Sequence, residues 1–296
     1  MLLTQTEGDA QDEAIGVAFI DGLHKLGWSP GSNVVIDQRL VGGDPERTRQ
    51  SAVELVNLQP DVIWTTGGLT LLALKRATHS IPIVFSTVYD PVGAGFVESL
   101  SRPDGNITGF TAGEFSMGGK MLEALKEVVP GVRRVAVVMN LDPPPHVAIW
   151  RTIEATADLL GLRATPADVQ GSADIEWVIE AFARQREGGL IVLSGPTINA
   201  HRELIAALAV RHHLPTVFGF RQFVRSGGLV SYGVNRVGQA AQSAAYVDRI
   251  LRGEKPADLP IQQPTRFELV LNLKTAKALG LTIPPAVLAR ADELIE

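Results

Sequence analysis

The chain has 296 residues, of which 45% are hydrophobic and 20% are charged, a length and composition typical of a globular protein with two domains. Its net charge of −5 argues against a nucleic-acid partner, because such partners are bound by an excess of Lys and Arg. Cysteine is absent, which excludes disulfides and thiolate metal sites, and no apolar run is long enough for direct membrane insertion.

The first residues do not form a signal peptide, since Met1 to Gln5 include neither a basic region nor a long apolar one. We interpret Leu2 to Gln5 as the remnant of a first strand in a trimmed or mis-started chain. A cytosolic protein with a natural start is the alternative.

Short, β-branched apolar runs predict strands that are covered on both faces of a sheet. These runs are residues 34–36, 61–64, 81–85, 135–139, 189–193, 215–218, 229–232 and 267–271. Apolar residues at helical spacing predict helices between them, at 69–75, 117–128, 149–160 and 175–182, and a short helix that ends before Gly280. Strands that alternate with helices predict βαβ units and a parallel sheet.

The two halves of the chain resemble each other, because the course from Gly27 to Ile83 is repeated between Gly161 and Thr216. We therefore predict an α/β fold of two similar Rossmann-like lobes, with one large Rossmann-like sheet as the alternative. Three extended stretches, 106–113, 231–235 and 259–264, are the predicted hinge crossings. They divide the chain into an N-terminal lobe of 1–112 with 236–260 and a C-terminal lobe of 113–235 with 261–296.

Catalytic motifs are incomplete in this sequence. Residues 113–120 approach a phosphate-binding loop, but Met121 stands where a Ser or Thr would bind Mg²⁺. His212 and His213 are adjacent on a predicted helix, where their side chains diverge and chelate poorly. We therefore predict no catalytic residue, no metal site and no cofactor.

Loops at the carboxyl ends of the predicted strands are the candidate ligand-binding elements, because these ends face the ligand crevice of an open parallel sheet. The candidate ligand-binding residues in them are Gln5, Thr6, Thr66, Gly67, Gly68, Thr87, Tyr89, Asp90, Asn140, Pro144, Gly195, Pro196, Phe220 and Tyr232.

Three groups of these residues suit a small zwitterion, and each has a structural alternative. Thr66 to Gly68 open a predicted helix whose N–H groups suit a carboxylate, or else Thr66 or Thr70 caps that helix. Asp90 suits an ammonium group, or else it caps a helix that begins at Pro91. The rings of Tyr89, Phe220 and Tyr232 suit an aromatic or aliphatic group, or else they pack internally.

Nine short stretches in order resemble one family, the exported substrate-binding proteins of ABC importers, in the subgroup labelled tryptophan/tyrosine-type. They are 42–47, 61–63, 81–85, 90–93, 106–109, 135–137, Phe223 with 227–229, 231–233, and the tail from Pro256. The resemblance implies a type I periplasmic binding protein, a monomer in the periplasm or otherwise exported. It would capture a small molecule by hinge closure in the interlobe cleft and deliver it to membrane permease subunits.

The resemblance leaves the ligand open. Residues 143–145 are three prolines, where family members have fewer prolines and more small polar residues, so an amino-acid-like or aromatic carboxylate is the expected ligand rather than one standard amino acid. The alternative function is a two-lobed enzyme, such as an isomerase acting on a small carboxylate, with Asp90 as the carboxylate in its cleft.

Overall fold

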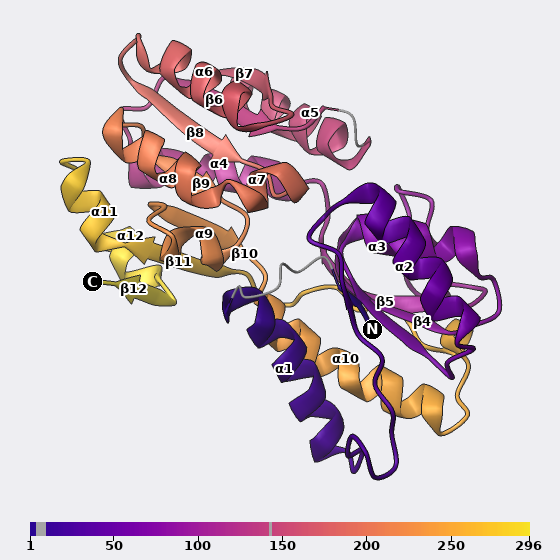
Figure 1. The fold of residues 1–296 in the computed structure, drawn as a ribbon. Coiled ribbons are helices and arrows are strands. Elements are labelled where there is room, and N and C mark those ends of the chain that lie inside the picture. The colour runs from indigo at the N-terminus through magenta and orange to yellow at the C-terminus, as the bar shows by residue number, and fades with distance from the viewer. Residues whose placement is uncertain (4–9, 142–143) are drawn as a thin grey trace. The chain divides into compact units, whose positions relative to one another are not determined.

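A computed structural model describes residues 1–3, 10–141 and 144–296, and the side chains of residues 1, 13–141 and 145–296. The chain divides into two α/β units (Figure 1). Unit 1 consists of Met1–Glu114 and Asn235–Thr265, and unit 2 consists of Phe115–Val234 and Arg266–Glu296. Each unit contains a largely parallel sheet, as the sequence predicts.

The unit boundaries differ from the predicted lobe boundaries mainly at residues 261–265, which the sequence-based prediction places in the C-terminal lobe. Gln262 forms a bridge to Phe110, its N–H donates to Gly109 O over 2.9 Å, and its carbonyl oxygen accepts from Thr111 N over 2.9 Å. These backbone bonds attach the segment to the last strand of unit 1, so 261–265 belong to that unit.

Unit 1 has a parallel five-stranded sheet in the order β2-β1-β3-β4-β5. Its strands are β1 (Leu2–Leu3), β2 (Arg39–Leu40), β3 (Ile63–Thr66), β4 (Ile83–Tyr89) and β5 (Ile107–Gly113). Its helices are α1 (Ala10–Lys25), α2 (Pro45–Asn57), α3 (Gly68–Ala77), α10 (Arg236–Leu251) and the 3₁₀ turn η1 (Pro256–Asp258).

Two helix pairs cover the faces of the unit 1 sheet, α2 with α3 and α1 with α10 (Figure 1). On the α2/α3 face, Ile63, Ile83, Phe85 and Ile107 pack with residues of those helices. On the α1/α10 face, a second cluster contains Trp64, Val84 and Phe110 with residues of α1 and α10. Alternate residues of β3, β4 and β5 therefore point to opposite faces, as the period of a strand requires.

Unit 2 has a seven-stranded sheet in the order β12-β11-β10-β9-β8-β6-β7, in which only the β10–β11 pair is antiparallel among the described strands. Its strands are β6 (Arg134–Met139), β7 (Arg163–Asp168), β8 (Gly188–Val192), β9 (Thr216–Phe218), β10 (Val230–Gly233), β11 (Glu268–Asn272) and β12 (Glu293–Ile295). Its helices are α4 (Met117–Val128), α5 (Pro144–Leu159), α6 (Ser172–Ala183), α7 (Pro196–Ala200), α8 (Arg202–Arg211), α9 (Arg221–Arg225), α11 (Leu273–Ala278) and α12 (Pro285–Arg290).

The first five strands of both units have the same spatial order, 2-1-3-4-5 in each unit's own chain order. In unit 2 this order is β7-β6-β8-β9-β10. In a sheet with this strand order, the chain adds strands first to one side of its first strand and then to the other. The point between the first and third strands, where the order reverses, is called the switch point, and ligands bind at the carboxyl ends of the strands beside it. The switch point lies between β1 and β3 in unit 1 and between β6 and β8 in unit 2.

Some predicted elements are wrong. Residues 34–36 form no strand, and Val35 is 86% exposed; the strand of that region is β2, at Arg39–Leu40. His212 and His213 follow α8 rather than lying within it, and His213 has a φ of +52°. Residues 106–113, predicted as a hinge crossing, contain β5, whose backbone pairs with β4 along its length.

Candidate functional site

The switch point of unit 2 carries a buried histidine between two strand-end loops. His146 of α5 is 8% exposed, and its Nδ1 lies 2.7 Å from the carbonyl oxygen of Asn140, just after β6. Its Nε2 lies 3.0 Å from the carbonyl oxygen of Ser194, just after β8. The imidazole ring therefore ties together the two loops at which the fold class places a ligand.

The other predicted residues of these loops lie close by in the chain. Asn140 Nδ2 donates to Gln170 Oε1 over 3.2 Å, so its side chain points toward the loop that follows β7. Gly195 precedes α7, and Pro196 is the first residue of that helix and is exposed. Pro144 is the first residue of α5.

The two predicted aromatic residues of unit 2 differ in their environments. Phe220 is only 5% exposed and precedes α9, which agrees with the packing alternative. Tyr232 of β10 is partly buried, and its ring centroid lies 5.9 Å from that of Phe267. Tyr232 therefore offers the more accessible ring of the two.

The carboxyl end of β3 in unit 1 leads directly into α3. Gly67 precedes the helix with a φ of +83°, a left-handed conformation that favours glycine, and no side chain caps the helix. Thr70 Oγ1 instead donates to Thr66 O over 2.6 Å, so the predicted capping by Thr66 or Thr70 is wrong. Among the residues that the structure describes, no side chain accepts from the first N–H groups of α3, an arrangement that suits an anion.

The carboxyl end of β4 is irregular. The pairing of β4 with β5 shifts register between Ser86 and Val88 and again between Val88 and Tyr89. Thr87 has a φ of +60°, which is rare for a β-branched residue, and Asp90 has a φ of +34°. Burial raises the pKa of the Tyr89 phenol to about 12, although the nearby charge of Arg236 acts in the opposite direction.

Asp90 caps a turn rather than the predicted helix. Its Oδ1 accepts from Gly93 N over 2.8 Å, and residues 91–95 form successive turns. A side-chain Cβ at Gly93 would lie 2.3 Å from Asp90 Oδ2, so only glycine leaves room for this contact. The turn therefore occupies at least one carboxylate oxygen of Asp90.

Two residues outside the predicted set, Gln239 and His146, join neighbouring loops of these edges. Gln239 of α10 is 7% exposed; it accepts from Thr87 Oγ1 over 3.4 Å and donates to Thr111 O over 2.6 Å. His146, described above, is the second. A polar side chain on the buried face of an amphipathic helix is the signal that indicates Gln239. No comparable signal indicates His146, whose partners are backbone oxygens.

Gln5 and Thr6 lie outside the described residues, so their role in binding stays a prediction. Among the residues that the structure does describe, no cluster of His, Cys, Asp and Glu could hold a metal ion. No helix within the same residues is long and apolar enough to cross a membrane.

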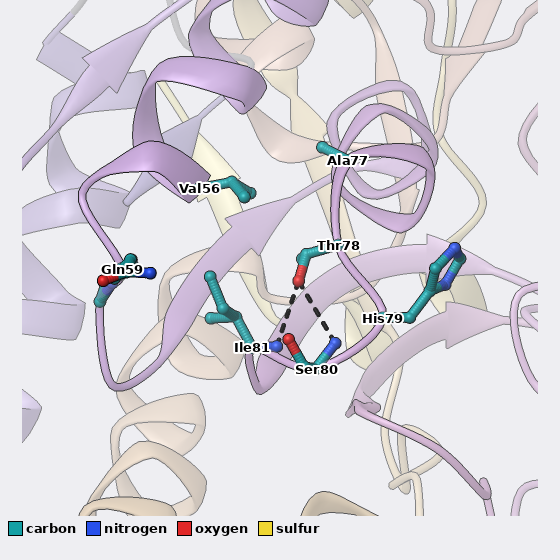
Figure 2. Close-up of a pocket in the computed structure, with 8 residues that line it drawn as sticks. Val56, Gln59, Ala77, Thr78, His79, Ser80 and Ile81 are labelled. Atoms are coloured by element: carbon teal, nitrogen blue, oxygen red, sulfur yellow. Dashed lines mark hydrogen bonds between the residues drawn. The ribbon is translucent and has the colours of Figure 1, made fainter.

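A pocket of about 390 Å³ lies at the other edge of the unit 1 sheet, beside the amino ends of β3 and β4 (Figure 2). It is lined by Val56, Gln59, Pro60, Ala77, Thr78, His79, Ser80 and Ile81. Thr78 Oγ1 accepts from Ser80 N over 3.3 Å and from Ile81 N over 3.2 Å, so the Thr78 hydroxyl stabilises the turn there. None of the predicted ligand-binding residues lines this pocket.

Comparison with known proteins gives a consistent result over the whole chain. The model of the ABC transporter substrate binding protein family matches residues 2–295. A tyrosine-binding protein of Clostridioides difficile is 25% identical over 266 residues, which cover 89% of this chain and 75% of that protein.

Two solved structures also match closely. A conserved domain protein from Vibrio cholerae has a TM-score of 0.91 and 31% identity, over 99% of this chain and 98% of that one. A Streptococcus pneumoniae ABC domain in complex with L-Trp has a TM-score of 0.88 and 23% identity, over 99% of each chain. The fold is therefore that of the type I periplasmic binding proteins. The family match and the tyrosine-binding relative indicate a binding protein, and they do not support the isomerase alternative.

Proposed function

Because this chain belongs to the family of ABC transporter substrate-binding proteins, we propose that it binds an aromatic amino acid, or a closely similar aromatic carboxylate, for an ABC importer. The observation that carries this ligand class is the tyrosine-binding relative, which aligns with 89% of the chain. The L-Trp complex of the Streptococcus pneumoniae domain, which has the same fold, agrees with it.

We propose that strand-end loops supply the groups that bind this ligand. In unit 1, the uncapped N–H groups at the start of α3 suit its carboxylate, because a helix start concentrates free donors and positive dipole. Tyr89 and Tyr232, both partly buried, offer aromatic rings to its side chain. His146 contacts the loops of Asn140 and Ser194 through its two ring nitrogens and holds them in place.

The same proposal includes a partner and a location. The membrane subunits of an ABC importer are the partner to which the protein delivers its ligand, and the protein works as a monomer outside the cytoplasmic membrane. The net charge of −5 agrees with the absence of a nucleic-acid partner.

A thermal unfolding series with L-Trp, L-Tyr and L-Phe tests the ligand class, with L-Leu and D-ribose as controls. A ligand at about 100 times its dissociation constant stabilises the folded state by about 2.7 kcal/mol, which raises the unfolding midpoint measurably. We expect at least one aromatic amino acid to do so and both controls to have no effect. Stabilisation by D-ribose alone would contradict the proposed ligand class.

The site is tested by isothermal titration of the ligand that gives the largest shift. Tyr89→Leu and Tyr232→Leu each remove one ring and should weaken binding about 10-fold or more, because a stacked aromatic pair contributes roughly 1 kcal/mol beyond its buried area. Tyr246→Phe is the matched control, since the Tyr246 hydroxyl donates to Pro260 O within unit 1 and Tyr246 packs in the core of that unit. Unchanged affinity in both leucine variants would show that the ligand lies elsewhere.

A further inference from the structure

The side chains of β4 do not alternate regularly to the end of the strand. Ile83 and Phe85 belong to the cluster on the α2/α3 face, whereas Val84 belongs to the cluster on the α1/α10 face. Strict alternation would place Val88 on the face of Val84, yet Val88 packs in the cluster of Ile83 and Phe85. The strand has therefore slipped by one residue between Phe85 and Val88.

The cause of this slip is the left-handed conformation of Thr87. The first register shift, between Ser86 and Val88, marks a bulge in which Thr87 is one extra residue of β4, and the second, between Val88 and Tyr89, leaves Ala112 as one extra residue of β5. A bulge reverses the face to which every following side chain points. With Val88 on the α2/α3 face, Tyr89 turns to the opposite face, where the charge of Arg236, the first residue of α10, acts on its phenol.

Thr87 adopts this conformation at an energetic cost, since left-handed φ values crowd the Cβ of a branched residue. Such a residue persists only when its surroundings hold it in place. Thr87 is 8% exposed, and its hydroxyl donates to Oε1 of the equally buried Gln239. The Gln239 amide donates in turn to Thr111 O of β5 over 2.6 Å, so one side chain of α10 attaches to the ends of both strands.

We infer that Gln239 and the left-handed bulge at Thr87 form a positioning device that turns Tyr89 toward α10 and thereby sets the affinity of unit 1 for its ligand. Gln239 and Thr87 act on ligand binding through Tyr89. This inference rests on the proposed function for the nature of the ligand and for its contact with Tyr89. The orientation of Tyr89 is a property of unit 1 alone and can be measured without a ligand.

The key variant is Thr87→Val, which keeps the branched shape of Thr87 and removes only the hydroxyl that holds Gln239. Gln239→Leu removes the other partner. Thr87→Ser restores the hydroxyl and is the rescue variant. Thr108→Val is the matched control, because Thr108 of β5 is fully buried and its hydroxyl donates to Leu259 O over 2.7 Å.

The first measurement is ligand affinity by isothermal titration beside urea unfolding of each variant. Thr87→Val and Gln239→Leu should weaken binding by roughly 10-fold, because each removes the hydrogen bond that orients Tyr89 and one such bond contributes about 1 kcal/mol. Thr87→Ser should bind the ligand with an affinity within about 3-fold of that of the unchanged protein, because the serine hydroxyl keeps the hydrogen bond to Gln239. Thr108→Val should lower the urea midpoint and leave affinity unchanged. Equal affinity losses in Thr87→Val and Thr108→Val would overturn the inference, because they would reflect stability alone.

The second measurement uses the ring signals of Tyr89 in the NMR spectrum of the ligand-free protein, assigned by their loss in Tyr89→Phe. These signals should move in Thr87→Val and Gln239→Leu, and should stay in place in Thr87→Ser and Thr108→Val. Signals that stay in place in all four variants would overturn the positioning device even if aromatic amino acids bind. If the signals move as expected but no aromatic compound binds, the device stands and the proposed ligand class fails.

Discussion

The indole ring of Trp64 lies flat against the phenyl ring of Phe19, with the ring centroids 3.9 Å apart and the planes 2° from parallel. This stack joins β3 to α1 in the core of unit 1. The indole Nε1 is buried without a hydrogen-bond partner among the described residues. The two rings therefore contribute apolar contact, while the indole N–H carries an uncompensated cost of burial.

Replacement of the two rings should have unequal effects. Phe19→Ala removes a whole buried ring and should lower the free energy of unfolding by about 3–5 kcal/mol. Trp64→Phe removes fewer ring atoms together with the unpaired N–H, so its cost should be less than about 2 kcal/mol. Urea unfolding measures both. A larger loss in Trp64→Phe than in Phe19→Ala would mean that the indole N–H has a partner in solution.

His146→Gln should destabilise unit 2 and weaken ligand binding together. The flexible glutamine side chain lacks the rigid ring whose two nitrogens contact Asn140 O and Ser194 O, so at least one of these two contacts is lost. The expected cost is about 1–3 kcal/mol in urea unfolding. His79→Gln is the matched control, and because His79 is exposed its effect should stay within about 0.5 kcal/mol. Equal effects of the two substitutions would contradict the tie between the loops.

Thr111→Val should raise the stability of the protein. The Thr111 side chain is 2% exposed, and its hydroxyl has no hydrogen-bond partner among the described residues. An isosteric methyl group removes the cost of burying an unpaired hydroxyl, and the Thr111 carbonyl keeps its bond from Gln239. We expect a gain of about 1 kcal/mol in urea unfolding. A loss of similar size would show that an ordered water satisfies the hydroxyl.

Gly109→Ala should prevent folding of unit 1. Gly109 has a φ of +155°, and a Cβ there would lie 2.1 Å from the backbone oxygen of Phe85 on the neighbouring strand. Neither backbone can move without breaking the β4–β5 pairing, so the loss should exceed about 4 kcal/mol. Gly131→Ala, with nothing within 4 Å of the new Cβ, is the control. Circular dichroism and solubility compare the two, and a soluble, fully folded Gly109→Ala protein would contradict this prediction.

The sequence predicts the strands that both faces of a sheet bury. β6 and β8 are almost continuous runs of small and branched apolar residues, and all their described residues except Arg134 are buried. β7 escapes prediction because four of its six residues are exposed, so its apolar content is low. Residues 34–36 have the apolar, β-branched composition of a strand but pair with no neighbouring strand, and Val35 is exposed. Composition alone therefore does not determine whether a segment forms a strand.

The candidate site is less predictable than the fold. The positions of Thr66, Tyr89, Asn140 and Gly195 follow from one rule, that loops after parallel strands share an edge of the sheet. The bulge at Thr87 follows from no local pattern, since nothing in a Ser-Thr-Val run predicts a left-handed threonine. It arises from contacts with α10, which lies far away in the chain.

The position of α10 in the chain also affects the order in which the protein is completed during synthesis. Unit 1 needs α10 to cover Trp64, Val84 and Phe110, yet the ribosome makes α10 only after residues 115–234 of unit 2. Nascent domains usually finish in the order in which they are made. Here the half of the molecule that emerges first must wait, with one apolar face of its sheet covered only by α1, until most of the other half has been made.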